Sequence, residues 1–217
     1  MDFYFIPDTC ALAVHIACHE ANIPLQLREI ERSPTGLRIK STRAHSSDYM
    51  SLNPKQKVPA IGLPNVPNGS ILTETQAILQ YIAWELAPAA ENGSLLPKNG
   101  LERWRAVELL NFITTEIHKA FSPLFNPDMS AKHRERAIQD LGRAFTILED
   151  TLGEKDFLIG QEISVIDCYA WTLLSWTRFF DDVDLAEWPS LVRYRQRILQ
   201  RPSVQKALEE ERLVFVF

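Results

Sequence analysis

The most reactive type of side chain near the N-terminus is the thiol of Cys10, in the stretch PDTCALAVHIACHEANIP over residues 7–24. An apolar run ends at Pro7 and an Asp-Thr pair precedes the cysteine, so the sequence predicts a helix beginning beside Cys10. Unpaired N–H groups and the positive end of the helix dipole there lower a thiol pKa from about 8.5 and favour a thiolate. The alternative is a small buried hydrophobe without a chemical role, and the residues alone leave both interpretations open.

Only part of thiol chemistry is open to this cysteine. No second cysteine follows three residues later, because the segment is Cys10-Ala11-Leu12-Ala13, and this excludes a dithiol cycle. One thiol can form a mixed disulfide that a second small thiol resolves, or it can lie beside a bound thiol that attacks an electrophile. Exchange requires the sulfur of Cys10 itself, whereas conjugation requires only hydrogen bonds and positive potential at the sulfur of the bound thiol.

Two other groups of residues in the N-terminal half of the sequence could bind a ligand. His15, Cys18 and His19 have a helical spacing that suits a metal, but no fourth ligand is evident, so we expect no metal. Glu74-Thr75 stands at a predicted helix start, where backbone amides suit a carboxylate and Glu74 could pair with an ammonium group. Ordinary helix capping is the alternative.

Polar candidates also occur in a loop and in a later helix. The basic side chains of the loop could form an anion site, although such residues more often mark a solvated loop. His118 and Lys119 are adjacent on a predicted helix and therefore point ~100° apart. His118 could orient a water or donate a proton toward a sulfur, and Lys119 could raise the local potential; a structural histidine is the alternative. The loop bases are Arg32, Arg38, Lys40 and Arg43.

The first elements that would position these groups follow the order strand, helix, strand. Residues 3–6 predict a strand buried on both faces, and residues 25–30 predict a second strand, with the Cys10 helix between them. Residues 32–56 show little periodicity and predict a loop with a helical turn near Asp48–Leu52.

A second strand pair and a helix complete the first part of the chain. Residues 58–63 predict a strand, and an Asn-Gly turn signal lies within residues 64–70. Residues 70–72 then predict the second strand of the hairpin. Thr73 and Gln76 have the spacing of a capping box at the start of the next helix. The order is therefore βαβ followed by ββα.

Residues 87–100 are rich in Ala, Pro, Gly and Asn and predict a linker to an all-helical domain. Ser164 and Asp167 form a second capping-box pattern, which we assign to folding and not to catalysis. The predicted helices cover residues 101–121, 131–152, 164–180, 188–200 and 202–212.

The composition of the 217 residues narrows the classes of function. A net charge of -5 argues against nucleic acid as the principal ligand. No segment approaches the roughly 20 apolar residues of a membrane span. Three cysteines are an odd-numbered and sparse set, unlike a disulfide framework, so we expect a soluble, reduced protein of the cytoplasm.

The joint pattern of these motifs resembles the cytosolic glutathione transferases. Val58-Pro59, then Glu74-Thr75 at a helix start, then a helical domain follow that family's order, and cysteine at position 10 resembles the bacterial beta class. The stretches ELLNFITTEIHKAFSPLFNPD (108–128) and QRPSVQKALEEE (200–211) are similar to segments of the same class. The resemblance covers essentially the whole chain.

The resemblance implies a thioredoxin-like α/β glutathione-binding domain over residues 1–86 and an all-α domain over residues 101–217. It also implies a homodimer, with glutathione as co-substrate in a cleft between the domains. Cys10 would lie against the glutathione sulfur, Val58 would bind the cysteinyl backbone beside a cis Pro59, and Glu74 and Thr75 would hold the γ-glutamyl end. Residues implied on the helical side, some of them across the dimer interface, are Asn111, Glu116, His118 and Lys119, with Trp176 as a wall of the hydrophobic-substrate site.

Several positions depart from the class pattern. Ala11 stands where a hydroxyl residue often accompanies the cysteine, and Gln56 stands where a glycine precedes the cis-proline loop. Thr75 replaces the usual serine but keeps the hydroxyl. The loop over residues 32–48 is longer than is typical, so the partner of the glycyl carboxylate is not assigned.

These features predict a detoxifying glutathione transferase that conjugates glutathione to small hydrophobic electrophiles. Thiol-disulfide exchange and reductive dehalogenation at Cys10 are further possibilities within the enzyme class. The alternative from another class is a non-catalytic adaptor or regulatory protein with the transferase fold, but such proteins tend to lose the residues that hold glutathione.

Overall fold

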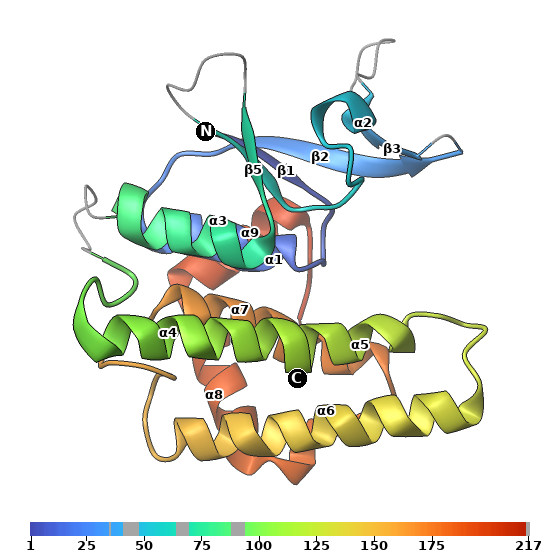
Figure 1. The fold of residues 1–217 in the computed structure, drawn as a ribbon, viewed down its shortest axis with the longest axis vertical. Helices are drawn as coiled ribbons and strands as arrows, with labels where there is room; N and C mark the ends of the chain where they lie inside the picture. The colour runs from blue at the N-terminus through green and yellow to red at the C-terminus, as the bar shows by residue number, and fades with distance from the viewer. Residues whose placement is uncertain (35, 41–47, 64–69, 88–93, 216–217) are drawn as a thin grey trace. The chain divides into compact units, whose positions relative to one another are not determined.

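The chain forms two compact units, one of Met1–Leu95 with Pro202–Phe217 and one of Leu96–Arg201. The sequence-based division assigned residues 202–217 to the helical domain. In the structure, helix α9 (Pro202–Glu211) instead packs on α1 (Ala11–Glu20) of the first unit, because its apolar side chains are buried there (Figure 1). The computed structural model describes residues 1–34, 36–40, 48–63, 70–87 and 94–215.

A five-stranded sheet in the order β3-β2-β1-β4-β5 forms the first unit. The parallel pairing of β1 with β2 through α1 confirms the predicted strand-helix-strand unit. The other neighbours are antiparallel, including β4 with β5. The Asn-Gly turn expected between these last two strands falls largely at residues 64–69, outside the described residues. The strands are β1 (Asp2–Phe5), β2 (Gln26–Ser33), β3 (Gly36–Ile39), β4 (Ala60–Gly62) and β5 (Ile71–Thr73).

Strand β3 lies where the sequence predicted a loop, so that prediction is wrong for residues 36–39. Ile30 of β2 faces Ile39 of β3, and the Ser33 hydroxyl donates to the Gly36 carbonyl at 2.7 Å. The helical turn expected nearby is confirmed as α2 (Tyr49–Leu52), which Asp48 caps by accepting the Met50 N–H.

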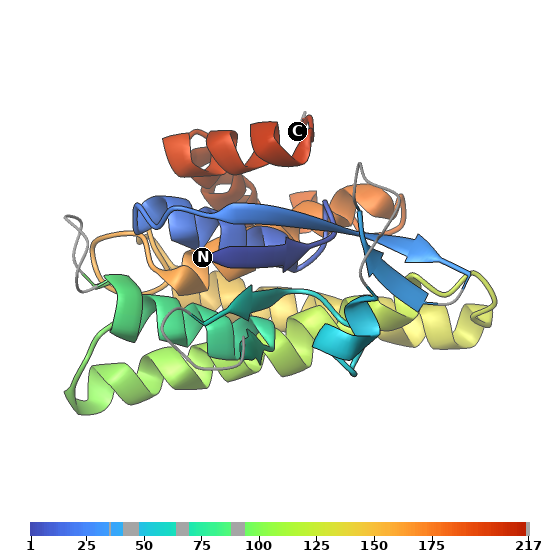
Figure 2. The ribbon, with the colours of Figure 1, turned by 90° about the horizontal axis from the view of Figure 1, so that it is seen from above.

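Both faces of the sheet are covered by helices. Helices α1 and α3 (Thr75–Tyr81) lie on one face and α2 on the other (Figures 1 and 2). Along β1 only Phe3 and Phe5 are fully buried, whereas Tyr4 is half-buried and packs toward α2. Both faces of the strand are therefore covered, as predicted, but the face toward α2 is only half-buried.

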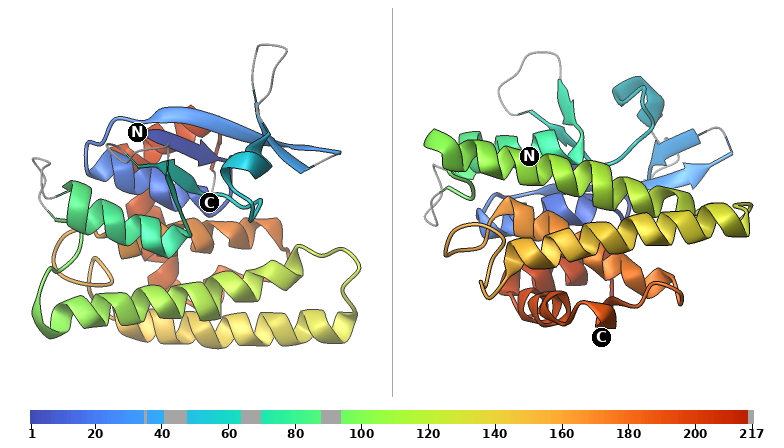
Figure 3. Two further views of the ribbon diagram at one scale, coloured as in Figure 1. Left: turned by 45° about the horizontal axis from the view of Figure 1, so that its top comes forward. Right: turned by 60° about the horizontal axis from the view of Figure 1, so that its bottom comes forward.

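The second unit is a helical bundle, as the sequence predicts. Helices α4 and α5 form one continuous rod with a π-helical stretch between them, and this rod runs beside α6 (Figures 1 and 3). No helix within the described residues is long and apolar enough to cross a membrane. The helices are α4 (Gly100–Phe112), η4 (Ile113–His118), α5 (Lys119–Leu124), α6 (Ala131–Leu152), α7 (Val165–Ser175), η5 (Trp176–Phe179), η6 (Leu185–Glu187) and α8 (Pro189–Leu199).

The capping box predicted at the start of α7 is confirmed. The Ser164 N–H donates to Asp167 Oδ2 at 2.9 Å. Asp167 is buried, and its other oxygen accepts the Leu158 N–H and the Tyr194 hydroxyl, both at 2.9 Å. One carboxylate therefore joins the preceding loop, the start of α7 and α8.

Candidate functional site

Cys10 lies at the N-terminal end of α1, as its sequence context predicts. Its Sγ donates to the Val58 carbonyl oxygen at 3.6 Å, and the side chain is buried, with 9% of the residue exposed. The Val58–Pro59 bond is cis. Two segments 48 residues apart in the sequence thus meet at the cysteine sulfur.

The prediction that the pKa of the Cys10 thiol is lowered is wrong in this structure. Burial raises the pKa of the Cys10 thiol, and the nearby Glu74 carboxylate also raises it. A hydrogen bond from Thr75 and the positive charge of Lys57 lower the pKa, but by less than burial raises it. The protonated thiol that results is the form that donates to the Val58 carbonyl.

Glu74 and Thr75 form the turn from β5 into α3. Glu74 has a left-handed backbone with φ 74°, an uncommon conformation for a residue other than glycine. Thr75 is buried and begins the helix. The capping box predicted from Thr73 and Gln76 is wrong, because the helix begins two residues later than Thr73 and has no side-chain cap.

Lys55 contacts the candidate residue Glu74, and the sequence interpretation did not name it. Its Nζ donates to Glu74 Oε1 at 2.5 Å and to Thr73 Oγ1 at 2.7 Å. The ion pair is exposed, with 52% of the Lys55 side chain and 68% of the Glu74 side chain accessible. The available signal was a lysine three residues before Val58, on the segment that leads into the cis bond.

Gln56 takes a conformation that glycine adopts readily. Its φ is 51°, and its Oε1 accepts the Leu37 N–H at 2.7 Å, which ties the segment before Val58 to β3. A Cβ added at Gly36 would lie 2.8 Å from the Gln56 oxygen and would displace it from this contact. The departure from glycine at position 56 therefore gives a specific contact with β3.

Two of the four loop bases form ion pairs with the neighbouring strand. Arg38 pairs with Glu31 and Lys40 pairs with Glu29, each at 2.7 Å and exposed on the sheet. These contacts favour the solvated interpretation of the two residues over an anion site. Arg43 lies outside the described residues.

In the helical unit, the structure brings His118 and Trp176 together. His118 Nδ1 lies 2.6 Å from the Tyr169 hydroxyl oxygen, and the imidazole meets the Trp176 ring edge-on at a centroid distance of 5.2 Å. Burial lowers the pKa of His118 to about 4, so the imidazole is neutral at pH 7. The Trp176 Nε1 is buried with no hydrogen-bond partner in the described part of the chain.

Glu116 and Lys119 lie apart from that aromatic pair. Both line a groove of about 670 Å³ between the α4–α5 rod and α6, opposite Asp140 and Arg143. The lining of this groove does not include His118. Asn111 is exposed on α4 and does not line the groove either. Of the residues that the resemblance implies on the helical side, this groove therefore holds only Glu116 and Lys119.

The low pKa of His118 predicts a loss of stability in acid. The unfolded chain binds a proton at this histidine near pH 6.5, whereas the folded chain binds it only near pH 4. The stabilisation from keeping His118 neutral is complete above pH 6.5 and is lost as the pH falls to 4, by about 3 kcal/mol at most. Urea unfolding of the wild type and of His118→Asn between pH 7 and pH 4 measures it. Equal pH slopes in the two proteins would contradict the assignment.

Comparison with known protein families gives two matches along the chain. The glutathione S-transferase N-terminal domain matches residues 9–84, and the glutathione S-transferase C-terminal domain matches residues 112–202. Each match falls mainly within one of the two structural units.

Whole-chain relatives agree with these matches. Glutathione S-transferase GstA of Escherichia coli O157:H7 is 32% identical over 98% of this chain and 100% of its own length. The bacterial beta-class glutathione S-transferase of Sphingomonas chungbukensis is 35% identical, with a TM-score of 0.84 over 99% of this chain and 100% of the other. A sphingomonad glutathione S-transferase solved in complex with glutathione is 33% identical, with a TM-score of 0.85 and the same coverage.

Proposed function

The chain belongs to the glutathione S-transferase family and resembles its bacterial beta class, and on that premise we propose that it conjugates glutathione to small hydrophobic electrophiles. The observation that carries the proposal is the approach of the Cys10 sulfur to the Val58 carbonyl at 3.6 Å. This contact puts a thiol beside the backbone groups that would hold the cysteinyl part of glutathione.

The first unit supplies a partner for two parts of the glutathione molecule. The Val58 N–H and C=O would pair with the cysteinyl backbone next to Pro59, and the carbonyl would give up its contact with Cys10 Sγ. Glu74 would bind the ammonium group of the γ-glutamyl end, and the amide of Thr75 at the start of α3 would face its carboxylate. Lys55, which pairs with Glu74, would adjust as the ammonium group binds.

The raised pKa of Cys10 favours conjugation over disulfide exchange as the main reaction. In conjugation the glutathione thiol loses its proton, and its sulfur attacks the electrophilic carbon as the leaving group departs with its electron pair. A protonated Cys10 would donate a hydrogen bond to that thiolate. Exchange, by contrast, requires Cys10 itself to lose its proton before it attacks a disulfide sulfur, and burial opposes this step.

The remaining assignments belong to the same proposal. We assign contact with the hydrophobic electrophile to the neutral His118 and to Trp176, which pack edge-on in an aromatic, largely buried environment. The reaction needs no metal. A homodimer, a role in detoxification and dehalogenation at Cys10 are implied by the resemblance; light scattering tests the first, and turnover of halogenated substrates tests the last.

Replacing Glu74 with alanine should weaken glutathione binding about tenfold, because the substitution removes one charge-assisted contact to the ammonium group. Titration calorimetry at millimolar glutathione measures the change. Glu108→Ala is the matched control, since Glu108 forms a similarly exposed ion pair with Arg105 in the helical unit. Wild-type protein that binds no millimolar glutathione would overturn the proposed function, and equal affinity in Glu74→Ala would remove Glu74 from the site.

A further inference from the structure

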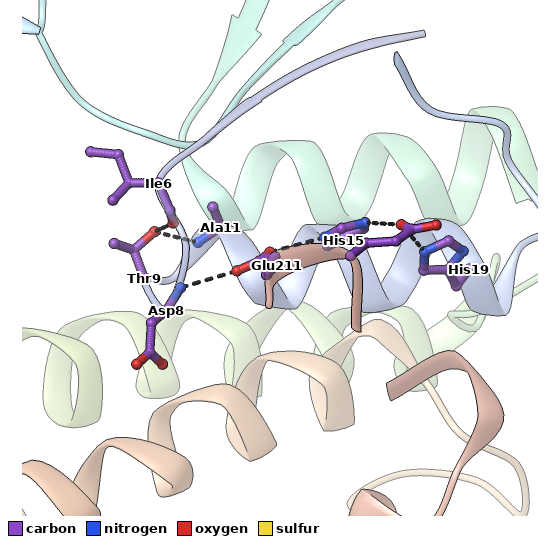
Figure 4. A network of polar contacts seen from close by, with 8 residues as sticks. Ile6, Asp8, Thr9, Ala11, His15, His19 and Glu211 are labelled. Carbon is purple, nitrogen blue, oxygen red and sulfur yellow. Dashed lines mark hydrogen bonds and ion pairs between the residues drawn. The ribbon is translucent and has the colours of Figure 1, made fainter. Parts of the chain in front are cut away.

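A polar network joins α9 to α1 inside the first unit. His15 is fully buried, and each of its ring nitrogens faces a carboxylate of α9 (Figure 4). Its Nε2 lies 2.7 Å from Glu210 Oε2, and its Nδ1 lies 2.9 Å from Glu211 Oε1. His19 Nε2 also contacts Glu210 Oε2, at 2.9 Å. The network is therefore centred on one histidine between two acidic residues.

The second oxygen of Glu211 reaches the segment that leads to Cys10. Glu211 Oε2 accepts the Asp8 N–H at 3.0 Å, as Figure 4 shows. Asp8 has a left-handed backbone with φ 65°, a conformation that costs a non-glycine residue energy and needs support from its surroundings. The same turn is tied internally by Thr9, whose hydroxyl donates to the Ile6 carbonyl at 2.8 Å. Glu211 is thus the support for this turn that comes from a distant part of the sequence.

A carboxylate at this place is not needed for packing alone. Glu211 is buried, and burial raises its pKa while His15 lowers it. Buried ion pairs add little net stability relative to apolar side chains of similar size. What the carboxylate supplies and a leucine would not is an acceptor for the Asp8 N–H.

A metal site is the other use for these residues. His15 Nε2, His19 Nε2 and Glu210 Oε2 lie within 4.8 Å of one another. These atoms already bond to each other, so the network is satisfied without an ion. Glu211, the residue that reaches the Asp8 turn, is not among the three.

We propose that Glu211, oriented by His15, is a positioning residue that fixes the turn at Asp8 and thereby the location of the Cys10 sulfur. The proposal rests on the function proposed above for Cys10. It makes the C-terminal helix α9 part of the scaffold of the thiol site, although α9 is about two hundred residues away in the sequence. Loss of the acceptor would free the turn two residues before Cys10 and expose the thiol.

The test compares the alkylation rate of Cys10 by iodoacetamide in three folded variants. Glu211→Leu should raise the rate about tenfold, in line with the loss of one hydrogen bond to a charged group. Glu211→Gln, which keeps an acceptor oxygen, should restore the rate to within about twofold of wild type. Glu210→Leu is the matched control, because Glu210 contacts the same histidine but not the turn. Cys18 and Cys168 are fully buried, and a Cys10→Ser protein gives their background.

Three results would overturn the proposal. One is an unchanged rate in Glu211→Leu, and another is an equal increase in Glu210→Leu. The third is a chelator that changes the wild-type rate as much as the substitution does, which would assign the network to a metal. If Glu211→Leu does not fold, hydrogen exchange of the wild-type protein tests the contact with the turn. The Asp8 amide should then exchange about a hundredfold more slowly than an unprotected amide, and unprotected exchange would overturn the proposal. Alkylation needs no glutathione, so failure of the proposed transferase function leaves this test intact.

Discussion

Replacing Cys10 with alanine should abolish glutathione-dependent disulfide exchange and leave glutathione conjugation within about tenfold of wild type. Exchange passes through a covalent bond to the Cys10 sulfur, so no other residue can substitute and a loss of about a thousandfold is expected. Conjugation loses only a hydrogen bond from the thiol, which burial keeps protonated by raising its pKa. Reduction of a small disulfide and conjugation of an aryl halide, measured on one preparation, give both rates.

Two controls make this comparison specific. Cys18→Ala should leave both rates unchanged, because Cys18 is fully buried and burial raises its pKa to about 12. Cys10→Ser keeps a hydrogen-bond donor and should conjugate faster than Cys10→Ala. Conjugation that falls to background in Cys10→Ala while glutathione still binds would show that the thiol has a covalent or essential role in that reaction too.

The parts of the fold that could be predicted from the sequence are those set by short-range patterns. The strand-helix-strand order around Cys10 follows from apolar runs broken by proline, and the helices of the second unit follow from apolar periodicity. The capping box of Ser164 and Asp167 is a three-residue pattern, and it is present as predicted. Thr73 and Gln76 share that spacing without forming a box, because the left-handed backbone of Glu74 delays the start of α3.

What escaped prediction depends on contacts between distant segments. Strand β3 has four residues and lies at the sheet edge, and its two apolar side chains are too few to establish a periodicity in the sequence. It gains its structure by pairing with β2. The packing of α9 on α1 places Glu210 and Glu211 at His15, nearly two hundred residues away. A spacing search among neighbours finds His19 but cannot find these two carboxylates.

The same limit applies to the electrostatics of the site. A cysteine at a helix start predicts a lowered thiol pKa, but the sign depends on burial, which the sequence does not give. At Cys10 burial prevails and the pKa rises. Adjacent helix positions predict that His118 and Lys119 point ~100° apart, but only the fold shows that His118 meets Trp176 and that Lys119 lines the groove beside α6.

Asp167→Ala should have the largest effect on stability of any single substitution considered for the second unit. The Asp167 carboxylate accepts hydrogen bonds from the Leu158 and Ser164 N–H groups and from the Tyr194 hydroxyl, all in a buried location. Removing it leaves these donors without an acceptor, and each buried orphan costs about 1–3 kcal/mol. We expect the free energy of unfolding to fall by about 4 kcal/mol, measured by denaturant titration.

Asp184→Ala is the matched control for this prediction. Asp184 also caps a helix, accepting the Ala186 N–H at 2.8 Å at the start of η6, but the contact is exposed to water. Water replaces the lost acceptor there, so a loss of only about 1 kcal/mol is expected. Asp167→Asn keeps one acceptor oxygen and should fall between the two. If Asp167→Ala cost no more than Asp184→Ala, the buried network around Asp167 would contribute only as an ordinary cap, and the link that it makes between α7, α8 and the preceding loop would not stabilise the unit.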